Sequence, residues 1–192
     1  MKPDKKAELV SPPRVLGVAS SFLNGIDLDP ASSDRANLLV SAKRHFTKED
    51  DGLKQEWNAD TVYLYPPTRL LSSKEQPENT LLFEEPKRFK KSGQLVWFQE
   101  AVKRYLRGEF NEAIVFLTSS DVALLSTQRE SIDFPMCIMR HKPKLYFDVE
   151  GLPSVNNSKC YGFIFYIPCP TNYFARIEEF KKAFGNLGRV YT

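Results

Sequence analysis

The sequence predicts an α/β protein, a three-layer α/β/α sandwich with helices on both faces of a central sheet. Two observations predict this class. Short apolar runs rich in β-branched and aromatic residues alternate along the chain with longer segments whose apolar residues recur every three or four positions. The short runs are apolar at nearly every position, which is typical of strands buried on both faces of a mostly parallel sheet.

Length and composition fit one domain. The chain has 192 residues, of which 42% are hydrophobic and 27% charged, and no apolar run approaches the roughly 20 residues of a membrane span. These values exclude membrane-spanning, collagen-like and disordered classes. The net charge is only +3, so any contact with nucleic acid must use a local basic patch. We expect a flexible arm over 1–10, a single domain over 11–192 and an insertion within it at 69–93.

The start of the chain and its cysteines predict an intracellular protein, cytoplasmic or nuclear. The first residues carry acids and lysines and contain no apolar segment, unlike a secretory signal or a transit peptide. Cys137, Cys160 and Cys169 are an odd number and widely spaced, so we expect free thiols. No Cys or His pair has zinc-ligand spacing, and no structural metal is expected.

In the first half of the chain, caps and prolines mark the predicted elements. Ser11 followed by two prolines is typical of a helix start, and an apolar stripe then continues to Leu23 before Gly25 ends the helix. A strand over 26–31 ends in acidic residues, and a second helix follows over 33–41. The β-rich run 61–65 is a strand that Pro66 and Pro67 terminate.

The second half continues the alternation. The segment 96–106 is an amphipathic helix whose Lys103 and Arg104 are expected to face solvent. The most apolar run, 113–117, is a strand, and a short helix follows at 122–128. Further strands are predicted at 135–139, 144–147 and 162–167, and a helix over 171–184 ends at Gly185 and Gly188.

Two predicted strand ends carry informative chemistry. In an α/β sheet, ligands bind beyond the carboxyl ends of the strands. One such end reads Asp29-Pro30-Ala31-Ser32 and the other Tyr65-Pro66-Pro67-Thr68. Each segment also has a purely structural interpretation: Asp29 as a helix cap, and the second segment as a strand-ending turn.

These two strand ends belong to a series of motifs that follow one another along the chain. Ser11-Pro12-Pro13 comes first, Leu28-Asp29-Pro30-Ala31-Ser32 second, and Phe46-Thr47 with Asp50-Asp51-Gly52-Leu53 and Trp57 third, before Tyr65-Pro66-Pro67-Thr68. In this order the chain resembles the phage-type DNA N-6-adenine methyltransferases, whose members read T-P-P, L-D-x-A-[AS], F-T-x-x-D-D-G-L-x-x-x-W and N-P-P-Y. The resemblance extends over nearly the whole chain from about residue 11.

The resemblance implies a methyltransferase-like (Rossmann-like) form of the sandwich and a cofactor, S-adenosylmethionine. The residues it assigns to the cofactor are Asp29, Pro30, Ala31, Ser32, Asp50 and Asp51. For the two aspartates at 50 and 51, an Asp-Gly turn is the alternative interpretation. In the family, the first residue of N-P-P-Y and a backbone carbonyl of the proline pair accept the N–H bonds of the target amine, and the last residue stacks on a flipped base.

Tyr65, Pro66, Pro67 and Thr68 are therefore the catalytic candidates. The family motif has an asparagine and an aromatic residue at its two ends, where this chain has Tyr65 and Thr68. Two functions stay open. One is an S-adenosylmethionine-dependent DNA adenine N6-methyltransferase. The other is a catalytically degenerate member that has lost the reaction, and with it any need for the cofactor, and that binds nucleic acid or protein as a scaffold in a larger complex.

Basic residues supply the candidates for nucleic-acid binding, with DNA favoured over RNA. They are Lys87, Arg88, Lys90, Lys91 and Arg140. Cations interleaved with aromatic residues can follow a phosphate backbone, although a solvated charged surface has the same composition. The stretch 69–107 is alternatively a docking surface for a protein partner, and no membrane partner is expected.

Overall fold

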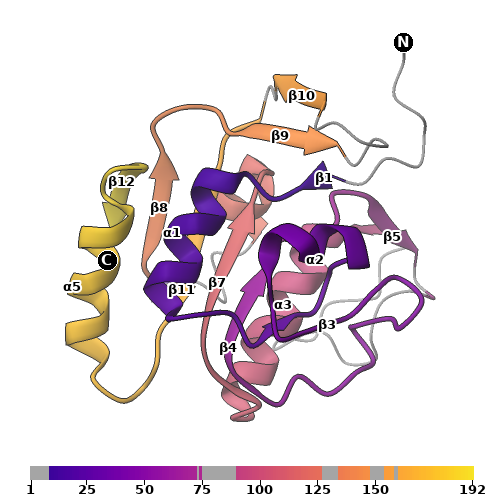
Figure 1. Ribbon diagram of the computed structural model, residues 1–192, viewed down its shortest axis with the longest axis horizontal. Coiled ribbons are helices and arrows are strands. Elements are labelled where there is room, and N and C mark those ends of the chain that lie inside the picture. Colours follow the sequence, from indigo (N-terminus) through magenta and orange to yellow (C-terminus); the bar gives the residue numbers. More distant parts are fainter. Residues whose placement is uncertain (1–8, 73, 75–89, 127–133, 148–153, 158–159) are drawn as a thin grey trace.

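A mixed seven-stranded sheet forms the centre of the protein. The computed structural model describes residues 9–72, 74, 90–126, 134–147, 154–157 and 160–192. Within them the main sheet has the strand order β12-β8-β11-β7-β4-β2-β3 (Figure 1). The strands are β2 (Leu28–Asp29), β3 (Arg44–His45), β4 (Ala59–Leu64), β7 (Phe110–Leu117), β8 (Met136–Met139), β11 (Phe163–Ile167) and β12 (Gly188–Tyr191).

The two halves of this sheet differ in strand direction. β3, β2, β4 and β7 are parallel, whereas β11 runs antiparallel to both β7 and β8, and β12 antiparallel to β8. The predicted α/β class is confirmed, but the sheet is mixed where a mostly parallel one was expected. The terminal strand was missed because Gly188 was interpreted as a helix end, whereas it pairs with Met139 and begins β12.

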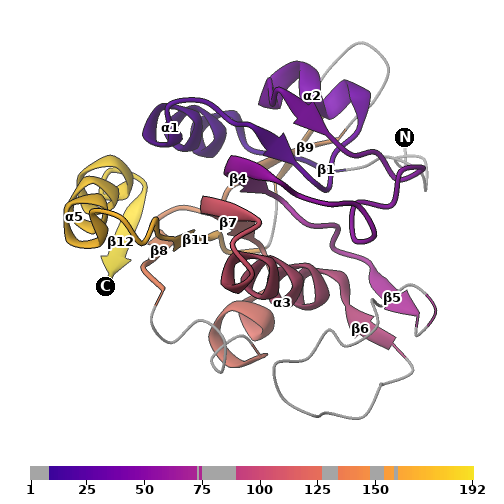
Figure 2. The same ribbon diagram turned by 90° about the horizontal axis from the view of Figure 1, so that it is seen from below.

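Helices cover both faces of the sheet. Figure 2 shows α1 (Pro13–Leu23) and α5 (Tyr173–Phe184) on one side and α3 (Gly93–Leu106) with η1 (Val122–Ser126) on the other. Side chains alternate between the two cores along each strand, because successive residues of a strand point to opposite faces. Val62 and Leu64 pack toward α3, and Tyr63 and Tyr65 toward α1. The predicted helices over 96–106 and 171–184 are confirmed.

Local caps explain where the first helices begin and end. Ser33 caps α2 (Asp34–Val40), with its Oγ accepting the N–H of Ala36 at 3.1 Å. α1 ends at Asn24, which has a left-handed φ of 56°, and Gly25 follows with φ 107°. A glycine accommodates that conformation without the steric cost that a Cβ would bring.

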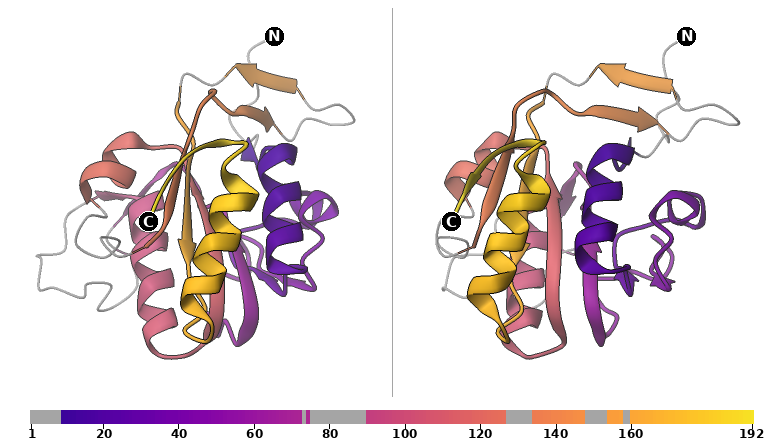
Figure 3. Two further views of the ribbon diagram at one scale, coloured as in Figure 1. Left: turned by 90° about the vertical axis from the view of Figure 1, so that its left-hand side faces the viewer. Right: turned by 60° about the vertical axis from the view of Figure 1, so that its left-hand side comes forward.

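Two smaller sheets flank the main one. β1 (Leu9–Val10), β9 (Lys144–Phe147) and β10 (Ser154–Asn157) form a three-stranded sheet, which Figures 1 and 3 place beyond the end toward which β7 points. Val10 is buried, so the last residues of the predicted 1–10 arm belong to the fold, and 1–8 lie outside the described residues. β5 (Leu70–Ser72) and β6 (Lys90–Ser92) pair at the two ends of the predicted insertion.

The prediction that Arg104 faces solvent is wrong. Its side chain is buried and forms ion pairs of 2.8 Å with both Glu100 and Glu109. It also donates to the carbonyl of Leu53 at 2.9 Å, and its guanidinium lies 4.9 Å from the ring centre of Trp57. Arg104 therefore joins α3 to the segment before β4 and is not part of a basic surface.

Candidate functional site

The chain reverses its direction of progress across the sheet between β2 and β4. From β2 it passes through α2 to β3 on one side, and it then returns to β4 on the other side of β2. The carboxyl ends of strands at such a switch point are where α/β sheets bind ligands. Asp29 ends β2, and Tyr65 directly follows β4. The structure thus brings the two predicted strand ends to one place.

The loop after β2 is held by backbone bonds and leaves the Asp29 side chain inside the protein. The N–H of Phe46 donates to the Asp29 carbonyl at 3.0 Å, and the N–H of Ser32 donates to the Phe46 carbonyl at 2.9 Å. One carboxylate oxygen of Asp29 accepts the N–H of Ala31 at 3.2 Å. Ser33, not Asp29, caps α2, so the helix-cap interpretation of Asp29 is wrong.

Burial makes Asp29 an unusual acid. Only 4% of the residue is exposed. Burial raises the pKa of this carboxyl to about 6, against the lowering effect of Ser32, of the Ala31 N–H and of nearby His45. At neutral pH the group is therefore an anion held in a poorly solvated place. A ligand that brings hydrogen-bond donors or a positive charge would stabilise that anion.

Two tyrosine side chains are buried in the core that contains α1, and the hydroxyl of one of them, Tyr63, lies near this carboxylate. Neither the Tyr63 nor the Tyr65 hydroxyl has a hydrogen-bond partner in the described part of the chain. Burial raises the pKa of both phenols, against the lowering effect of the neighbouring Ser11 hydroxyl on Tyr63 and of the Thr118 hydroxyl on Tyr65, and the Asp29 charge raises the pKa of Tyr63 further. The ring of Tyr65 lies 5.1 Å from that of Phe116. Sequence reasoning missed Tyr63, because strand periodicity predicts only that it is buried.

The backbone of the proline pair lies close to the start of α3. Pro66 is buried, Pro67 is half-buried and Thr68 is exposed. A Cβ at Gly93 would lie 2.5 Å from the Pro67 carbonyl oxygen, so only glycine fits at the first position of α3. The segment therefore ends a strand as the turn interpretation expects, and it also supports the start of a helix.

Gln94 belongs to no recognisable sequence motif, and it links α3 to the end of β7. Its Nε2 donates to the Thr118 hydroxyl at 2.9 Å, and its Oε1 accepts the N–H groups of Thr118 and Ser119. All of these atoms lie beyond the carboxyl end of a strand parallel to β4. The positions are 24 residues apart, and no local pattern connects them.

The loop carrying Asp50 and Asp51 packs against the loop after β2. A Cβ at Gly52 would lie only 2.0 Å from the Pro30 carbonyl oxygen. Asp50 accepts the N–H and hydroxyl of Thr47, both at 2.8 Å, and these bonds lower its pKa. Asp51 has a left-handed φ of 53° and pairs with Lys54 at 2.7 Å. The Asp-Gly turn is confirmed as the local structure, and a ligand role for either aspartate stays a prediction.

The basic candidates are not assembled at this site. Lys87 and Arg88 lie outside the described residues, and Lys90 and Lys91 contribute backbone to β6. Arg140 is exposed directly after β8, near the opposite edge of the sheet from β2. The three cysteines are free, as predicted. Across the described residues, no cluster of His, Cys, Asp or Glu could hold a metal, and no helix has the length and apolarity to cross a membrane.

Comparison with known proteins gives no relative. No family model matches the chain, and neither does a curated protein or a solved structure. The site must therefore be interpreted from its own geometry: a buried carboxylate at the switch point of the sheet, with the Tyr63 hydroxyl near it.

Proposed function

We propose that this protein binds S-adenosylmethionine at the switch between β2 and β4, and that it is a DNA adenine N6-methyltransferase-like protein with a Rossmann-like sandwich. The buried Asp29 carboxylate at that switch carries the proposal. Keeping an anion there is unfavourable unless something pairs with it. A ligand with cationic and hydroxyl donors provides that pairing.

The chemistry of the donor set fits this cofactor. S-adenosylmethionine carries an ammonium group and two ribose hydroxyls, which are hydrogen-bond donors. The switch point offers the Asp29 carboxylate and the nearby Tyr63 hydroxyl as acceptors. Asp29 and the backbone of Pro30, Ala31 and Ser32 would hold it. When bound, the cofactor supplies an electrophilic methyl group on a sulfonium centre.

The second candidate, a catalytically degenerate subunit, is favoured by one observation about the altered motif. Tyr65 is only 8% exposed and its ring packs against Phe116, while Thr68 is exposed and has no ring to stack on a base. The side chain that in the resembled family accepts the amine N–H is here directed into the core beside α1. This arrangement supports a subunit that binds nucleic acid or protein and does not methylate efficiently.

Calorimetry tests the cofactor proposal. Purified protein titrated with S-adenosylmethionine should bind with a micromolar Kd, and Asp29→Asn should weaken binding by about ten- to a hundredfold, as expected for loss of a charged hydrogen-bond acceptor. Asp60→Asn is the matched control, because Asp60 is an exposed carboxylate at the amino end of β4. The absence of heat up to millimolar cofactor with folded protein would refute the proposal.

A methylation assay then separates the two candidates. Transfer of a tritiated methyl group to adenine in DNA by the natural chain would establish the enzyme. If the natural chain binds cofactor but transfers nothing, the double change Tyr65→Asn with Thr68→Tyr restores the family motif. Gain of transfer would show that only the ends of the motif were lost, and no gain would favour the scaffold.

A further inference from the structure

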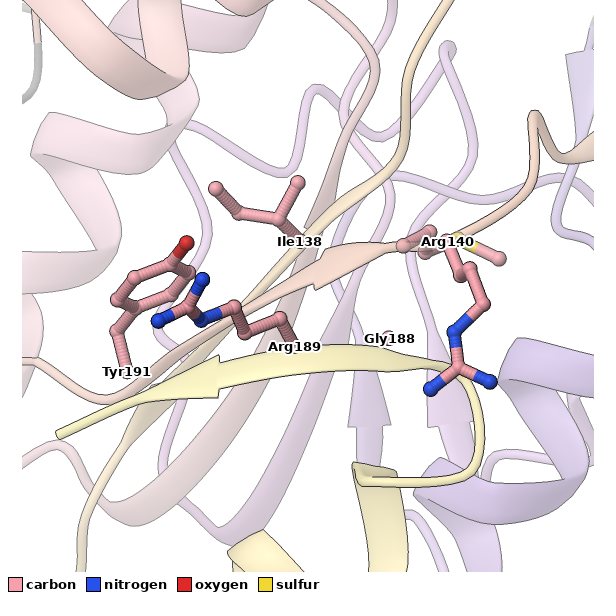
Figure 4. A pocket seen from close by; sticks show the side chains of 6 residues that line it. Ile138, Arg140, Gly188, Arg189 and Tyr191 are labelled. Atoms are coloured by element: carbon pink, nitrogen blue, oxygen red, sulfur yellow. The ribbon is translucent and has the colours of Figure 1, made fainter.

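A hollow at the far edge of the sheet combines arginine side chains with an exposed aromatic ring. It has a volume of about 550 Å³ and lies where β8 meets β12. None of the residues that line it is acidic; they are Ile138, Met139, Arg140, Gly188, Arg189 and Tyr191. Figure 4 shows the Arg189 side chain beside the Tyr191 ring, with Arg140 on the other side of Gly188. The hollow therefore has an apolar floor and a cationic rim.

The aromatic ring is positioned for stacking. Tyr191 is 44% exposed, and the guanidinium carbon of Arg189 lies 5.3 Å from its ring centre. A planar guanidinium and a phenol ring side by side offer a surface on which an unpaired base can stack. Ile138, which is opposite Arg189 in the strand register and so lies on the same face of the sheet, provides apolar contact for the same base.

A second cation–aromatic pair adjoins the hollow. The Nζ of Lys142 lies 5.4 Å from the ring centre of Tyr161, which is 54% exposed. Tyr161 directly precedes Gly162, whose carbonyl accepts the N–H of Met139 at 2.9 Å. The Arg189–Tyr191 pair thus lies alongside β8 on its β12 side, level with Ile138 and Met136, and the Lys142–Tyr161 pair lies just beyond the carboxyl end of β8 on its β11 side.

We propose that this surface binds single-stranded nucleic acid, with a base stacked on the Arg189–Tyr191 pair and the neighbouring phosphates paired with Arg140 and Arg189. Alternating cations and exposed rings match the alternating phosphates and bases of a single strand. An acidic peptide would match the cations but would leave the rings and the apolar floor without a partner. The inference deepens the nucleic-acid part of the proposed function and does not depend on the cofactor, because β12 lies at the opposite edge of the sheet from β2.

Fluorescence anisotropy with a labelled mixed-sequence 12-nucleotide DNA strand tests the inference on the full chain. Arg189→Met with Tyr191→Ala should weaken binding at least about tenfold, because a stacked base and a phosphate contact are lost together. The control Lys48→Met with Phe174→Ala also removes one exposed cation and one exposed ring, from elsewhere on the surface, and should bind like the natural chain. Circular dichroism melting verifies that each variant is folded.

Salt dependence separates phosphate contact from an indirect effect. Arg140→Met does not change β12 itself, and it should reduce the slope of log K against log salt by about 0.7, the value for one phosphate of a single strand. Equal binding by the Arg189→Met, Tyr191→Ala variant and the control would overturn the inference. So would no binding at 50 mM salt, or displacement of the strand by polyglutamate at the same charge concentration. Calorimetry with S-adenosylmethionine should be unchanged in these variants, so the two proposals can fail separately.

Discussion

Asp29→Asn should change how the stability of this protein depends on pH. Asp29 is buried, and burial raises its pKa from an ordinary 3.8 to about 6. The native state therefore retains a proton that the unfolded state releases between about pH 4 and pH 6. Stability from this group is fully present below about pH 4 and is lost as the pH rises through 6. An asparagine has the same shape and carries no such proton.

The size of this change in stability follows from the pKa shift of Asp29. A difference of about two pKa units between the native and unfolded states corresponds to about 3 kcal/mol of unfolding free energy. The stability of Asp29→Asn relative to the natural chain should thus rise by about 3 kcal/mol between pH 4 and pH 8. Any constant effect of the new amide cancels in this comparison, and so does the titration of every other group that the substitution leaves unchanged.

Urea unfolding at half-unit steps of pH, followed by fluorescence of the buried Trp57 and Trp97, measures this difference. Asp50→Asn is a control for which the pH dependence of stability should have the opposite sign. Hydrogen bonds from Thr47 lower the pKa of Asp50, so its stabilising contribution is present at neutral pH and is lost as the pH falls. If the curves of Asp29→Asn and the natural chain ran parallel from pH 4 to pH 8, Asp29 would not be a desolvated anion and the proposed cofactor site would lose its main support.

Three further pairs of substitutions, each a test with its control, probe the packing by urea unfolding. Gly52→Ala should lower the free energy of unfolding by more than about 2 kcal/mol, because its Cβ would lie 2.0 Å from the Pro30 carbonyl oxygen. Gly17→Ala in α1 meets nothing within 4 Å and should raise the free energy of unfolding by up to about 1 kcal/mol. Similar effects of the two changes would contradict the close approach of the two loops. Arg104→Met should lower the free energy of unfolding by about 3–5 kcal/mol, because buried Glu100 loses its 2.8 Å partner and keeps only Lys103 at 3.8 Å. Arg107→Met, at an exposed position, should lower it by no more than about 1 kcal/mol. Equal losses would refute the buried role of Arg104. Tyr63→Phe removes a buried hydroxyl that lies near Ser11 without a hydrogen bond of good geometry, so it should not lower the free energy of unfolding. Tyr166→Phe removes a 2.7 Å bond to Glu112 and should lower it by about 1–2 kcal/mol. A matching loss at Tyr63 would show that its hydroxyl is bonded to Ser11.

Most helices and central strands of this protein could be predicted from local sequence. α1 follows from its prolines and apolar stripe, α2 from the Ser33 cap, and β4, β7 and β11 from uninterrupted apolar runs. These signals work because periodicity and capping depend on residues within a few positions of one another. The location of Asp29-Pro30 and of Tyr65-Pro66 beyond the carboxyl ends of strands could also be anticipated, since both segments follow apolar runs.

The partners of individual side chains could not be predicted in this way. Arg104 lies in an amphipathic helix at a position that looks solvent-exposed, and only the approach of Glu109 and the 53–57 segment buries it. Gln94 meets Thr118 across 24 residues, and Arg189 meets Tyr191 over a hollow that exists only because β12 pairs with β8. The contacts of Arg104 and Gln94 join residues far apart in the sequence, and the contact of Arg189 with Tyr191 depends on β12, a strand that the sequence did not predict.

By itself the sequence determined the fold class, the main elements and the two strand ends that make the candidate site. The tertiary structure alone decided that the sheet is mixed, that β2 and β4 are neighbours at its switch point, and that Asp29 lies buried near the hydroxyl of Tyr63. The reason is physical. Secondary structure is set by short-range steric and hydrogen-bonding preferences, whereas strand order and the burial of a charge depend on contacts between segments far apart in the chain, such as Leu28 with Val62.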